Sequence, residues 1–288
     1  MKFGEYEVFT IETGDFALDG GAMFGVVPKV LWNRVIPCDD KNRIPMVMRT
    51  LLIRYKDRTI LVDTGIGTKN NEKFHKIYGI DLSKNTLTKS LAEHGVTPAD
   101  ITDVIQTHLH FDHAGGAVEL EADGTPKLAF PNATYYVQRD HWDWANNPTD
   151  KDKASFLPQD FLPLKEYGKL ELLNGEEELI PGLSLEIVHG HTKAQQLVRL
   201  TSGDQSLLYC ADLIPTSRHV PAPYIMGYDI EPLVTLAEKQ KTLEKAATDN
   251  TILVFEHDYD TEACTLEMKD GKYVVRASGE LMEVIAEQ

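Results

Sequence analysis

The sequence predicts an α+β protein in which two sheets pack together and helices cover their outer faces. Both halves of the 288-residue chain contain short runs that alternate or are rich in β-branched residues, as strands do. Each half also contains stretches with the apolar spacing of a helix. No low-complexity linker interrupts the chain, so we expect residues 1–288 to form a single domain. Periodicity alone leaves other α/β layouts open.

The first half is expected to consist mainly of strands joined by turns. The expected elements are a strand at 6–11, a glycine-rich loop at 14–25, a hairpin of strands at 47–55 and 59–62, a helix at 87–94, strands at 101–107 and 134–137, and a helix at 139–146. The polar turn 56–58 separates the two apolar runs of the hairpin. Gly95 marks the end of the first helix.

The second half repeats this style. The expected elements are strands at 183–188, 196–200 and 206–209, a helix at 232–247, strands at 251–255 and 272–276, and a helix at 280–286. Since strands occur in both halves and each half has its own helices, two packed sheets account for the pattern.

The composition narrows the function classes. A formal net charge of −16 repels phosphate backbones and anionic lipids, so we expect neither a nucleic-acid nor a membrane partner. The first residues lack an apolar run, and no stretch approaches the roughly 18 apolar residues of a membrane helix. Three cysteines without a CxxC pair fit a reducing compartment. We therefore expect a cytoplasmic protein.

Four candidate ligands lie within six residues, directly after the apolar run 101–107. The segment reads THLHFDHAGG over 107–116, and its candidate ligands are His108, His110, Asp112 and His113. One histidine in a polar loop usually only forms hydrogen bonds, but this spacing indicates convergent ligands. Imidazole nitrogen and carboxylate oxygen are ligands that zinc, iron and manganese accept, and the lack of cysteine argues against a purely structural zinc site.

This segment resembles the HxHxDH signature of the metallo-β-lactamase superfamily. Further segments resemble the family's other motifs in the expected order: LVDTG at 61–65, GHT at 190–192, AD at 211–212 and FEHD at 255–258. The resemblance covers residues 60 to 258. It implies a four-layer αββα sandwich with the metals at one edge.

The resemblance also implies two divalent metal ions and the residues that hold them. The implied ligands are His108, His110 and His191 for the first ion, Asp112, His113 and His257 for the second, and Asp212 as a bridge between both. Asp63 would orient a histidine ligand through its other ring nitrogen. We favour zinc, while iron, manganese and cobalt stay open because the same donors accept them.

The remaining histidines are assigned by position. His189 competes with His191, but the family ligand directly precedes threonine, which selects His191. His219 is a candidate for the pocket wall. The others are expected to be surface or structural residues: His75, His94 and His141.

Hydrolysis is the chemistry that such a centre predicts. Metal binding lowers the pKa of water from about 15.7 to about 7, which supplies hydroxide at neutral pH. We expect a metal-bridging hydroxide to attack the substrate, with the residual positive charge stabilising the oxyanion that develops. Asp112 is the expected catalytic residue that carries a proton to the leaving group.

Among family members, the chain resembles the N-acyl homoserine lactonases and the methyl parathion hydrolase-like group. A thiolate-using β-lactamase would carry cysteine where Asp212 stands, and a nuclease would present a basic surface. The resemblance implies a small ester or lactone as substrate, quorum-quenching activity and a homodimer. A phosphotriesterase-like hydrolase and a mono-iron sulfur dioxygenase-type oxidoreductase stay open as alternatives.

The substrate pocket is less defined by sequence. Candidate apolar wall residues are Met23, Phe24, Val27, Trp32 and Phe111. The best-known lactonases place a tyrosine shortly after the bridging aspartate, whereas residues 213–215 here are Leu-Ile-Pro. Tyr224 or Tyr228 is the candidate for that role.

Overall fold

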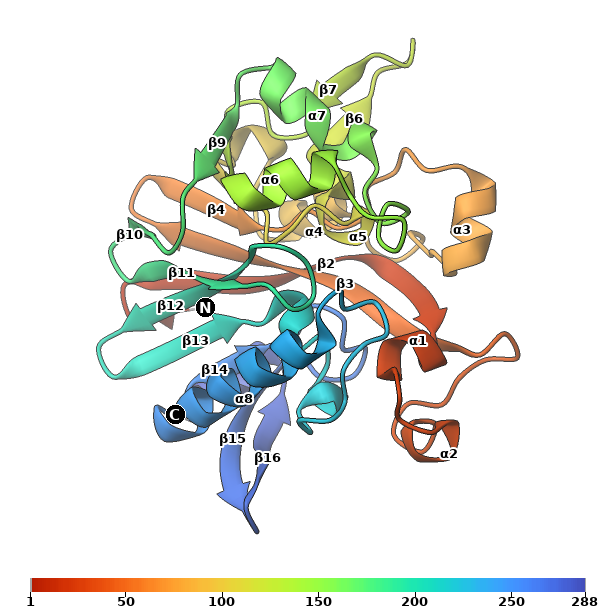
Figure 1. Ribbon diagram of the computed structural model, residues 1–288. Coiled ribbons are helices and arrows are strands. Elements are labelled where there is room, and N and C mark those ends of the chain that lie inside the picture. Colours follow the sequence, from red (N-terminus) through yellow and green to blue (C-terminus); the bar gives the residue numbers. More distant parts are fainter. Residues whose placement is uncertain (1, 288) are drawn as a thin grey trace.

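Two seven-stranded sheets form the body of the chain in this computed structural model, which describes residues 2–287. The first sheet has the order β1-β2-β3-β4-β5-β8-β9, and the second has β10-β11-β12-β13-β14-β15-β16. In the first sheet, β4, β5, β8 and β9 run parallel, as do β13 and β14 in the second. Figure 1 shows the two sheets stacked, with α6 and α7 beyond one and α8 beyond the other.

The strands of the first sheet are β1 (Lys2–Phe3), β2 (Tyr6–Asp19), β3 (Arg43–Tyr55), β4 (Arg58–Val62), β5 (Asp103–Ile105), β8 (Thr134–Gln138) and β9 (Leu170–Leu173). Those of the second are β10 (Glu178–Ile180), β11 (Leu183–Val188), β12 (Gln195–Ser202), β13 (Gln205–Tyr209), β14 (Ile252–Val254), β15 (Ala263–Lys269) and β16 (Lys272–Gly279). A separate pair is β6 (Val118–Leu120) with β7 (Pro126–Leu128). The helices are α1 (Gly20–Phe24), α2 (Lys29–Trp32), α3 (Glu72–Tyr78), α4 (Leu87–Glu93), α5 (Phe111–Ala114), α6 (Arg139–Asn146), α7 (Pro158–Glu166), α8 (Pro232–Thr248) and α9 (Leu281–Ala286).

The central strand β3 shows why its segment 51–53 is apolar at every position. Leu51 and Ile53 belong to the core between the two sheets, whereas Leu52 belongs to the core between the first sheet and its helices. Side chains alternate across a strand, so a strand covered on both faces must be apolar at every position. The expected four-layer αββα sandwich is thereby confirmed.

The predicted elements are confirmed with one clear exception. The glycine-rich segment expected as a loop at 14–25 instead continues β2 to Asp19 and then forms α1. A bulge between Glu12 and Gly14 accommodates Gly14, whose φ is +145°. The Asp19 side chain accepts a hydrogen bond from the Ala22 amide and begins the helix.

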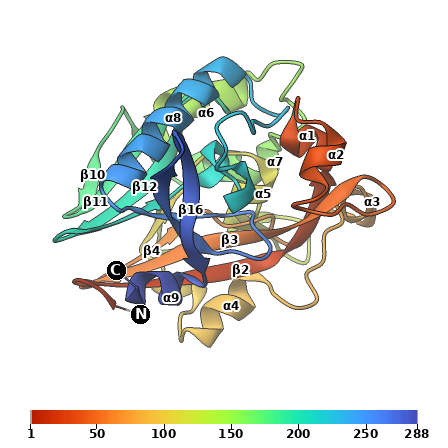
Figure 2. The same cartoon turned by 90° about the horizontal axis from the view of Figure 1, so that it is seen from below.

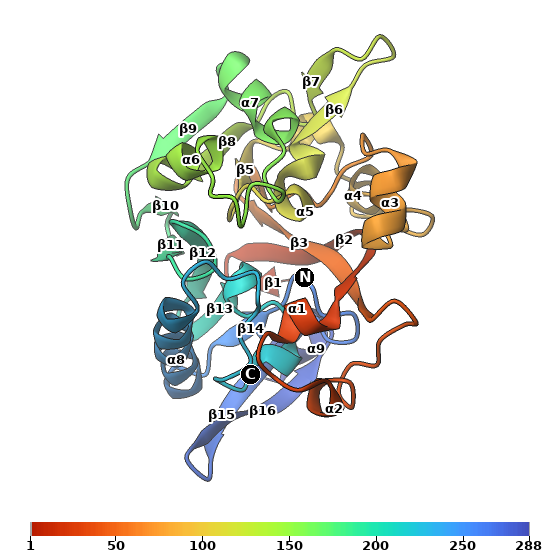
Figure 3. The ribbon, with the colours of Figure 1, turned by 45° about the vertical axis from the view of Figure 1, so that its right-hand side comes forward.

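Two short helices, α1 and α3, lie near the loop that carries the histidine motif. Figures 2 and 3 show α1 and α3 on the side of α5, with α2 farther out. The sequence did not indicate α3 or α7; the latter contains Pro163 within the helix. Within residues 2–287, no helix is long and apolar enough to cross a bilayer.

Candidate metal centre

The histidine motif lies at the carboxyl end of a buried parallel strand. β5 ends at Ile105, and α5 places Asp112 and His113 on one short helical turn. Asp63 follows the neighbouring parallel strand β4, so its side chain meets the same edge. Each of the four candidate ligands in the motif is at most 7% exposed. The sheet therefore presents these polar groups together at one buried edge.

The other three candidate ligands come from the second sheet. His191 lies between β11 and β12, Asp212 follows β13, and His257 follows β14. All three are buried. Since β13 and β14 are parallel, their following residues reach the same edge. The structure thus brings together all seven residues that the resemblance implied, in the groups His108–His110–His191–Asp212 and Asp112–His113–His257.

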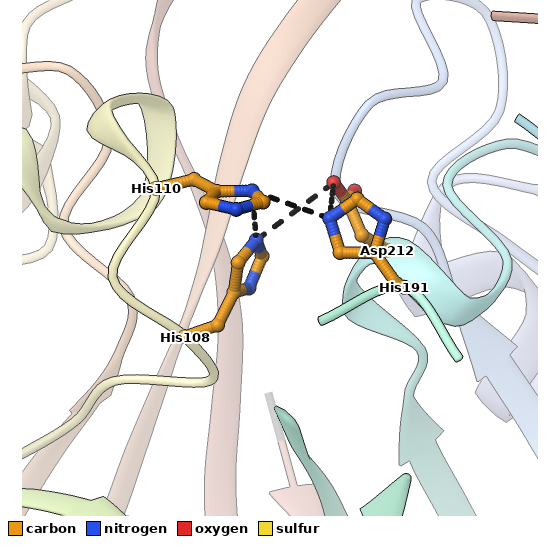
Figure 4. A group of neighbouring side chains, drawn as sticks. All are labelled: His108, His110, His191 and Asp212. Carbon is orange, nitrogen blue, oxygen red and sulfur yellow. Dashed lines mark hydrogen bonds and ion pairs between the residues drawn. The ribbon is translucent and has the colours of Figure 1, made fainter. Parts of the chain in front are cut away.

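The first group is tightly packed (Figure 4). His110 Nδ1 lies 3.1 Å from His108 Nε2 and 3.2 Å from His191 Nε2. Asp212 Oδ2 lies 3.1 Å from His191 Nε2. Donors arranged tetrahedrally at zinc-ligand distances of about 2.0–2.1 Å would be roughly 3.3 Å apart. The nitrogen separations are therefore those of ligands around one ion.

Asp212 also reaches the second group. Its Oδ1 lies 3.2 Å from His257 Nε2, while its Oδ2 lies 3.6 Å from His113 Nε2. Within the second group, His257 Nε2 and His113 Nε2 are 3.2 Å apart. One carboxylate consequently faces both groups, as a bridging ligand must.

Hydrogen bonds on the outer nitrogens leave the inner lone pairs free for a cation. Nδ1 of His191 faces Asp229 Oδ1 at 2.9 Å, and Nδ1 of His257 faces the Val47 carbonyl at 3.0 Å. With a proton on each Nδ1, both Nε2 lone pairs point inward. His110 presents Nδ1 instead, and its buried Nε2 has no hydrogen-bond partner among residues 2–287. The donors therefore fit divalent metal ions.

Asp63 fixes the motif from behind. Its carboxylate accepts hydrogen bonds from the Thr107 amide at 2.7 Å and the Thr107 hydroxyl at 2.6 Å, and it faces His113 Nδ1 at 3.1 Å. The Thr107 hydroxyl can then accept from His108 Nδ1, which lies 3.0 Å away. Asp63 holds a left-handed backbone with φ of +61°, an unfavourable conformation that these bonds stabilise.

The electrostatics differ between the histidines. Burial, together with neighbouring histidines, holds the pKa values of His108 and His110 well below the ordinary value. Burial would also lower the pKa of His191, but Asp212 and Asp229 outweigh it and raise this pKa to about 9. Asp212 in turn has a pKa well below normal, because His191 and His113 outweigh its burial. The carboxylates thus favour a positive charge beside His191, while His108 and His110 offer unprotonated nitrogens.

Two further histidines support the fold around the centre. His141 Nε2 accepts from the Leu109 amide at 2.8 Å, while Nδ1 faces the Lys193 carbonyl at 2.7 Å, so it joins the two ligand loops. His219 is also structural: it stacks on Phe24 and lies 2.8 Å from the Met23 carbonyl. It is 1% exposed and is not part of the cavity wall.

His189 lies outside the ligand cluster. Its Nδ1 accepts a hydrogen bond from the Ala194 amide at 3.2 Å. The Glu238 carboxylate accepts from the amides of His189 and Gly190 and so anchors the start of the His191 loop. The structure therefore places His191, rather than His189, among the candidate ligands.

A cavity of about 230 Å³ opens onto the centre. Its wall includes Leu18, Met23, Met46, Tyr78, Phe111, Lys151, Asp152, Met226 and Tyr228. The predicted wall residues Met23 and Phe111 do line it, whereas Phe24, Val27 and Trp32 pack in the core beneath. Of the two candidate tyrosines, Tyr228 lines the cavity and Tyr224 does not.

Two phenols in this wall are free to bind a ligand. Within the described chain, the hydroxyl groups of Tyr78 and Tyr228 form no hydrogen bond, so each can donate one into the cavity. Burial and the nearby Asp112 carboxylate raise the pKa values of both, so both stay protonated at neutral pH. The sequence offered no signal for Tyr78, because α3 was not foreseen.

Sequence reasoning also missed the roles of two carboxylates. Asp229 lies 38 positions beyond its partner His191, and no spacing rule connects them. Glu256 precedes His257 in the FEHD segment but faces His113 Nδ1 at 3.0 Å instead. Burial raises the pKa of Glu256 to about 7.

Comparison with known proteins gives a consistent picture. Residues 49–257 match the family model described as the metallo-beta-lactamase superfamily. The N-acyl homoserine lactonase AiiA of Bacillus thuringiensis subsp. kurstaki is 28% identical over 223 residues, which cover 73% of this chain and 81% of that protein.

Two solved structures show the same fold. A probable metal-dependent hydrolase from Staphylococcus aureus aligns with a TM-score of 0.89 and 28% identity, covering 97% of this chain and 98% of that one. AidC, described as a dizinc quorum-quenching lactonase in complex with a product, aligns with a TM-score of 0.76 and 24% identity over 96% and 95% of the two chains. The second likeness shows the fold alone.

Proposed function

The chain belongs to the metallo-β-lactamase superfamily, and from that premise we propose that it is a dinuclear-metal-dependent hydrolase of a small lactone or ester. The observation that carries the proposal is the position of Asp212, whose two oxygens face the two ligand groups at 3.1 Å and 3.2 Å. A single-metal site would need neither this shared carboxylate nor the complete second group. These features favour the hydrolase over the mono-iron oxidoreductase.

The residues of each ion follow from the two groups. His108, His110 and His191 would hold one ion, and His113 and His257 with Asp112 would hold the other. When bound, the ions supply a hydroxide nucleophile at neutral pH and polarise the carbonyl oxygen of the substrate. The chain itself positions the metal-donor nitrogens, because hydrogen bonds on the outer ring nitrogens hold the imidazoles in their orientations.

Proton transfer is assigned to Asp112. It lines the cavity next to the open side of the centre, and its Oδ2 lies 3.8 Å from His113 Nε2 and 3.7 Å from His257 Nε2. From there the carboxylate could take up the proton that the nucleophile loses and deliver it to the leaving oxygen of the substrate. The candidate ligands around it are nearly fully buried, which strengthens these interactions.

Tyr228 is the residue we assign to polarise the substrate carbonyl. Its phenol lines the cavity, and within residues 2–287 it has no hydrogen-bond partner. Three methionines line the same cavity: Met23, Met46 and Met226. Methionine side chains adapt to varied apolar groups, which suits an acyl chain. The named relatives of this chain include N-acyl homoserine lactonases, and this supports the same substrate class.

The deciding experiment combines metal content with substrate turnover. The purified protein is expected to contain two divalent ions, with zinc favoured, and to open an N-acyl homoserine lactone faster than it cleaves an aryl phosphotriester. Turnover of the phosphotriester alone would establish the phosphotriesterase-like alternative. One iron per chain without turnover of either substrate would overturn the hydrolase proposal.

A further inference from the structure

One lysine at the mouth of the cavity connects two segments that lie 76 to 78 residues apart. Lys151 Nζ donates to the carbonyl oxygens of Gly227 at 3.0 Å, Tyr228 at 2.9 Å and Asp229 at 2.9 Å. An ammonium group has three donors, and here all three are used on three consecutive carbonyls. The contact therefore closes one side of the cavity mouth.

The lysine is held in place by its own neighbours. The Asp152 carboxylate is 4% exposed and accepts from the amide and hydroxyl of Thr149 and from the Trp144 indole at 2.7 Å. The Ser155 carbonyl accepts from the Phe111 amide at 2.9 Å, which ties the segment to α5. Lys151 thus extends from a fixed base, although its own side chain is exposed.

The segment on the other side carries two groups that the proposed chemistry uses. Tyr228 lines the cavity, and Asp229 faces His191 Nδ1 at 2.9 Å. A second lysine, Lys239 of α8, holds the preceding stretch through the carbonyls of Pro221 and Tyr224. Lys239 is 1% exposed, so it anchors the stretch from within the core. The amides of Gly227 and Ile230 also donate to the carbonyls of Ala22 at 2.7 Å and His191 at 3.1 Å. The Lys151 contact differs from these in that its side chain is exposed at the cavity mouth.

We propose that Lys151 is a positioning residue that fastens residues 227–229 over the centre, setting the place of Tyr228 in the cavity and of Asp229 behind His191. The inference rests on the proposed function for its kinetic consequence but not for its structural one. Charge-assisted hydrogen bonds are stronger than neutral ones, and catalytic groups displaced by about 1 Å lose much of their effect. Release of Lys151 would therefore loosen both groups together.

The test compares Lys151→Met with Lys153→Met in the metal-loaded protein. Lys153 is a matched control, because it lies two residues away and, among residues 2–287, its ammonium pairs only with the exposed Asp150. Hydrogen exchange of peptides covering 224–231 is expected to accelerate about tenfold in the first variant and to stay unchanged in the control. Transfer of metal to a chelator is expected to accelerate about threefold, through the link to His191.

Kinetics separate positioning from direct contact with substrate. With an N-acyl homoserine lactone, Lys151→Met is expected to lower kcat about tenfold, and Lys151→Arg to recover part of it together with the exchange protection. A raised KM with unchanged exchange would overturn the proposal, because the lysine would then act on the substrate directly. Unchanged exchange and kinetics would also overturn it. If the wild type opens no lactone, the lactone assignment of the proposed function fails while the exchange comparison still decides the role of Lys151.

Discussion

The two ligand groups share Asp212 but differ in the charge that surrounds them. In the second group, His113 Nδ1 faces two fully buried carboxylates, Asp63 at 3.1 Å and Glu256 at 3.0 Å. In the first group, only His191 faces a carboxylate on its outer side, that of Asp229. One group therefore has two carboxylates behind one imidazole, of which Asp63 forms the hydrogen bond, and the other has a single carboxylate.

This difference has electrostatic consequences. Although burial lowers it, the pKa of His113 is raised well above normal by Glu256, Asp112 and Asp212. The pKa values of His108 and His110 lie well below normal, so both are neutral at pH 7. A cation meets two unprotonated imidazoles in the first group and displaces a proton from His191 alone, whereas in the second group the pKa values of both His113 and His257 are raised. Metal binding to the second group is thus the more dependent on pH.

The largest expected effect comes from removing what the groups share. Asp212→Ala takes a ligand from both ions, and His110→Ala takes one from the first alone. Hydrolysis is expected to fall at least about a thousandfold in both, with bound metal reduced, because nucleophile and electrophile activation depend on the ions. Far-UV circular dichroism should stay near wild type. The exposed Asp204→Ala serves as control, and wild-type activity in Asp212→Ala would contradict the bridging role.

A smaller effect tests the carboxylates that lie behind His113 and His191. Asp229→Asn leaves His191 without a carboxylate, so metal affinity is expected to fall about 10- to 100-fold. Glu256→Gln leaves Asp63 in place behind His113, and the expected loss is less than about fivefold. Chelator competition measures both. Equal losses in the two variants would show that the groups do not differ as their surroundings indicate.

The smallest effect concerns two histidines that brace opposite sides of the centre. Burial lowers the pKa of His141 to about 4 and that of His219 to about 3, so both are neutral in the folded state. The unfolded chain takes up a proton near pH 6.5, so stability is full above that pH and falls as the pH drops.

Replacing either histidine with glutamine removes the part of this pH dependence of stability that the replaced side chain contributes. Between pH 6.5 and 5.5, each substitution is expected to reduce the wild-type loss in the free energy of unfolding by about 1 kcal/mol. Urea unfolding at the two pH values measures the difference. An identical pH dependence in wild type and variants would mean that these side chains do not carry it.

Local sequence order explains which features were predictable. The motif at 108–113 and the apolar runs of β3 and β4 depend on neighbours in the chain, and the structure confirms the fold inferred from them. The glycine-rich stretch was misassigned because the 13-residue partner strand β3 extends β2 past Gly14 to Asp19. Tertiary pairing overrides local preference there.

The missed site residues share one property: their roles arise only after the chain has folded. Asp229 meets His191 across 38 residues, and Lys151 meets its three carbonyls across 76 or more. No periodicity or motif spacing encodes contacts of this kind. Tyr78 was not predicted because its position depends on where α3 packs. Its ring lies against that of Phe111, with centroids 4.8 Å apart.

The origin of the ligands in both sheets has a consequence for assembly. His108, His110 and Asp112 follow a strand of the first sheet, whereas Asp212 and His257 follow strands of the second. Any ion bound by both sets acts as a cross-link between the sheets that is absent from the unfolded chain. Binding of the ion then stabilises the folded state by RT ln(1 + [L]/Kd), where [L] is the concentration of the free metal ion. The supply of metal would thus affect the stability of the folded protein as well as its catalytic activity.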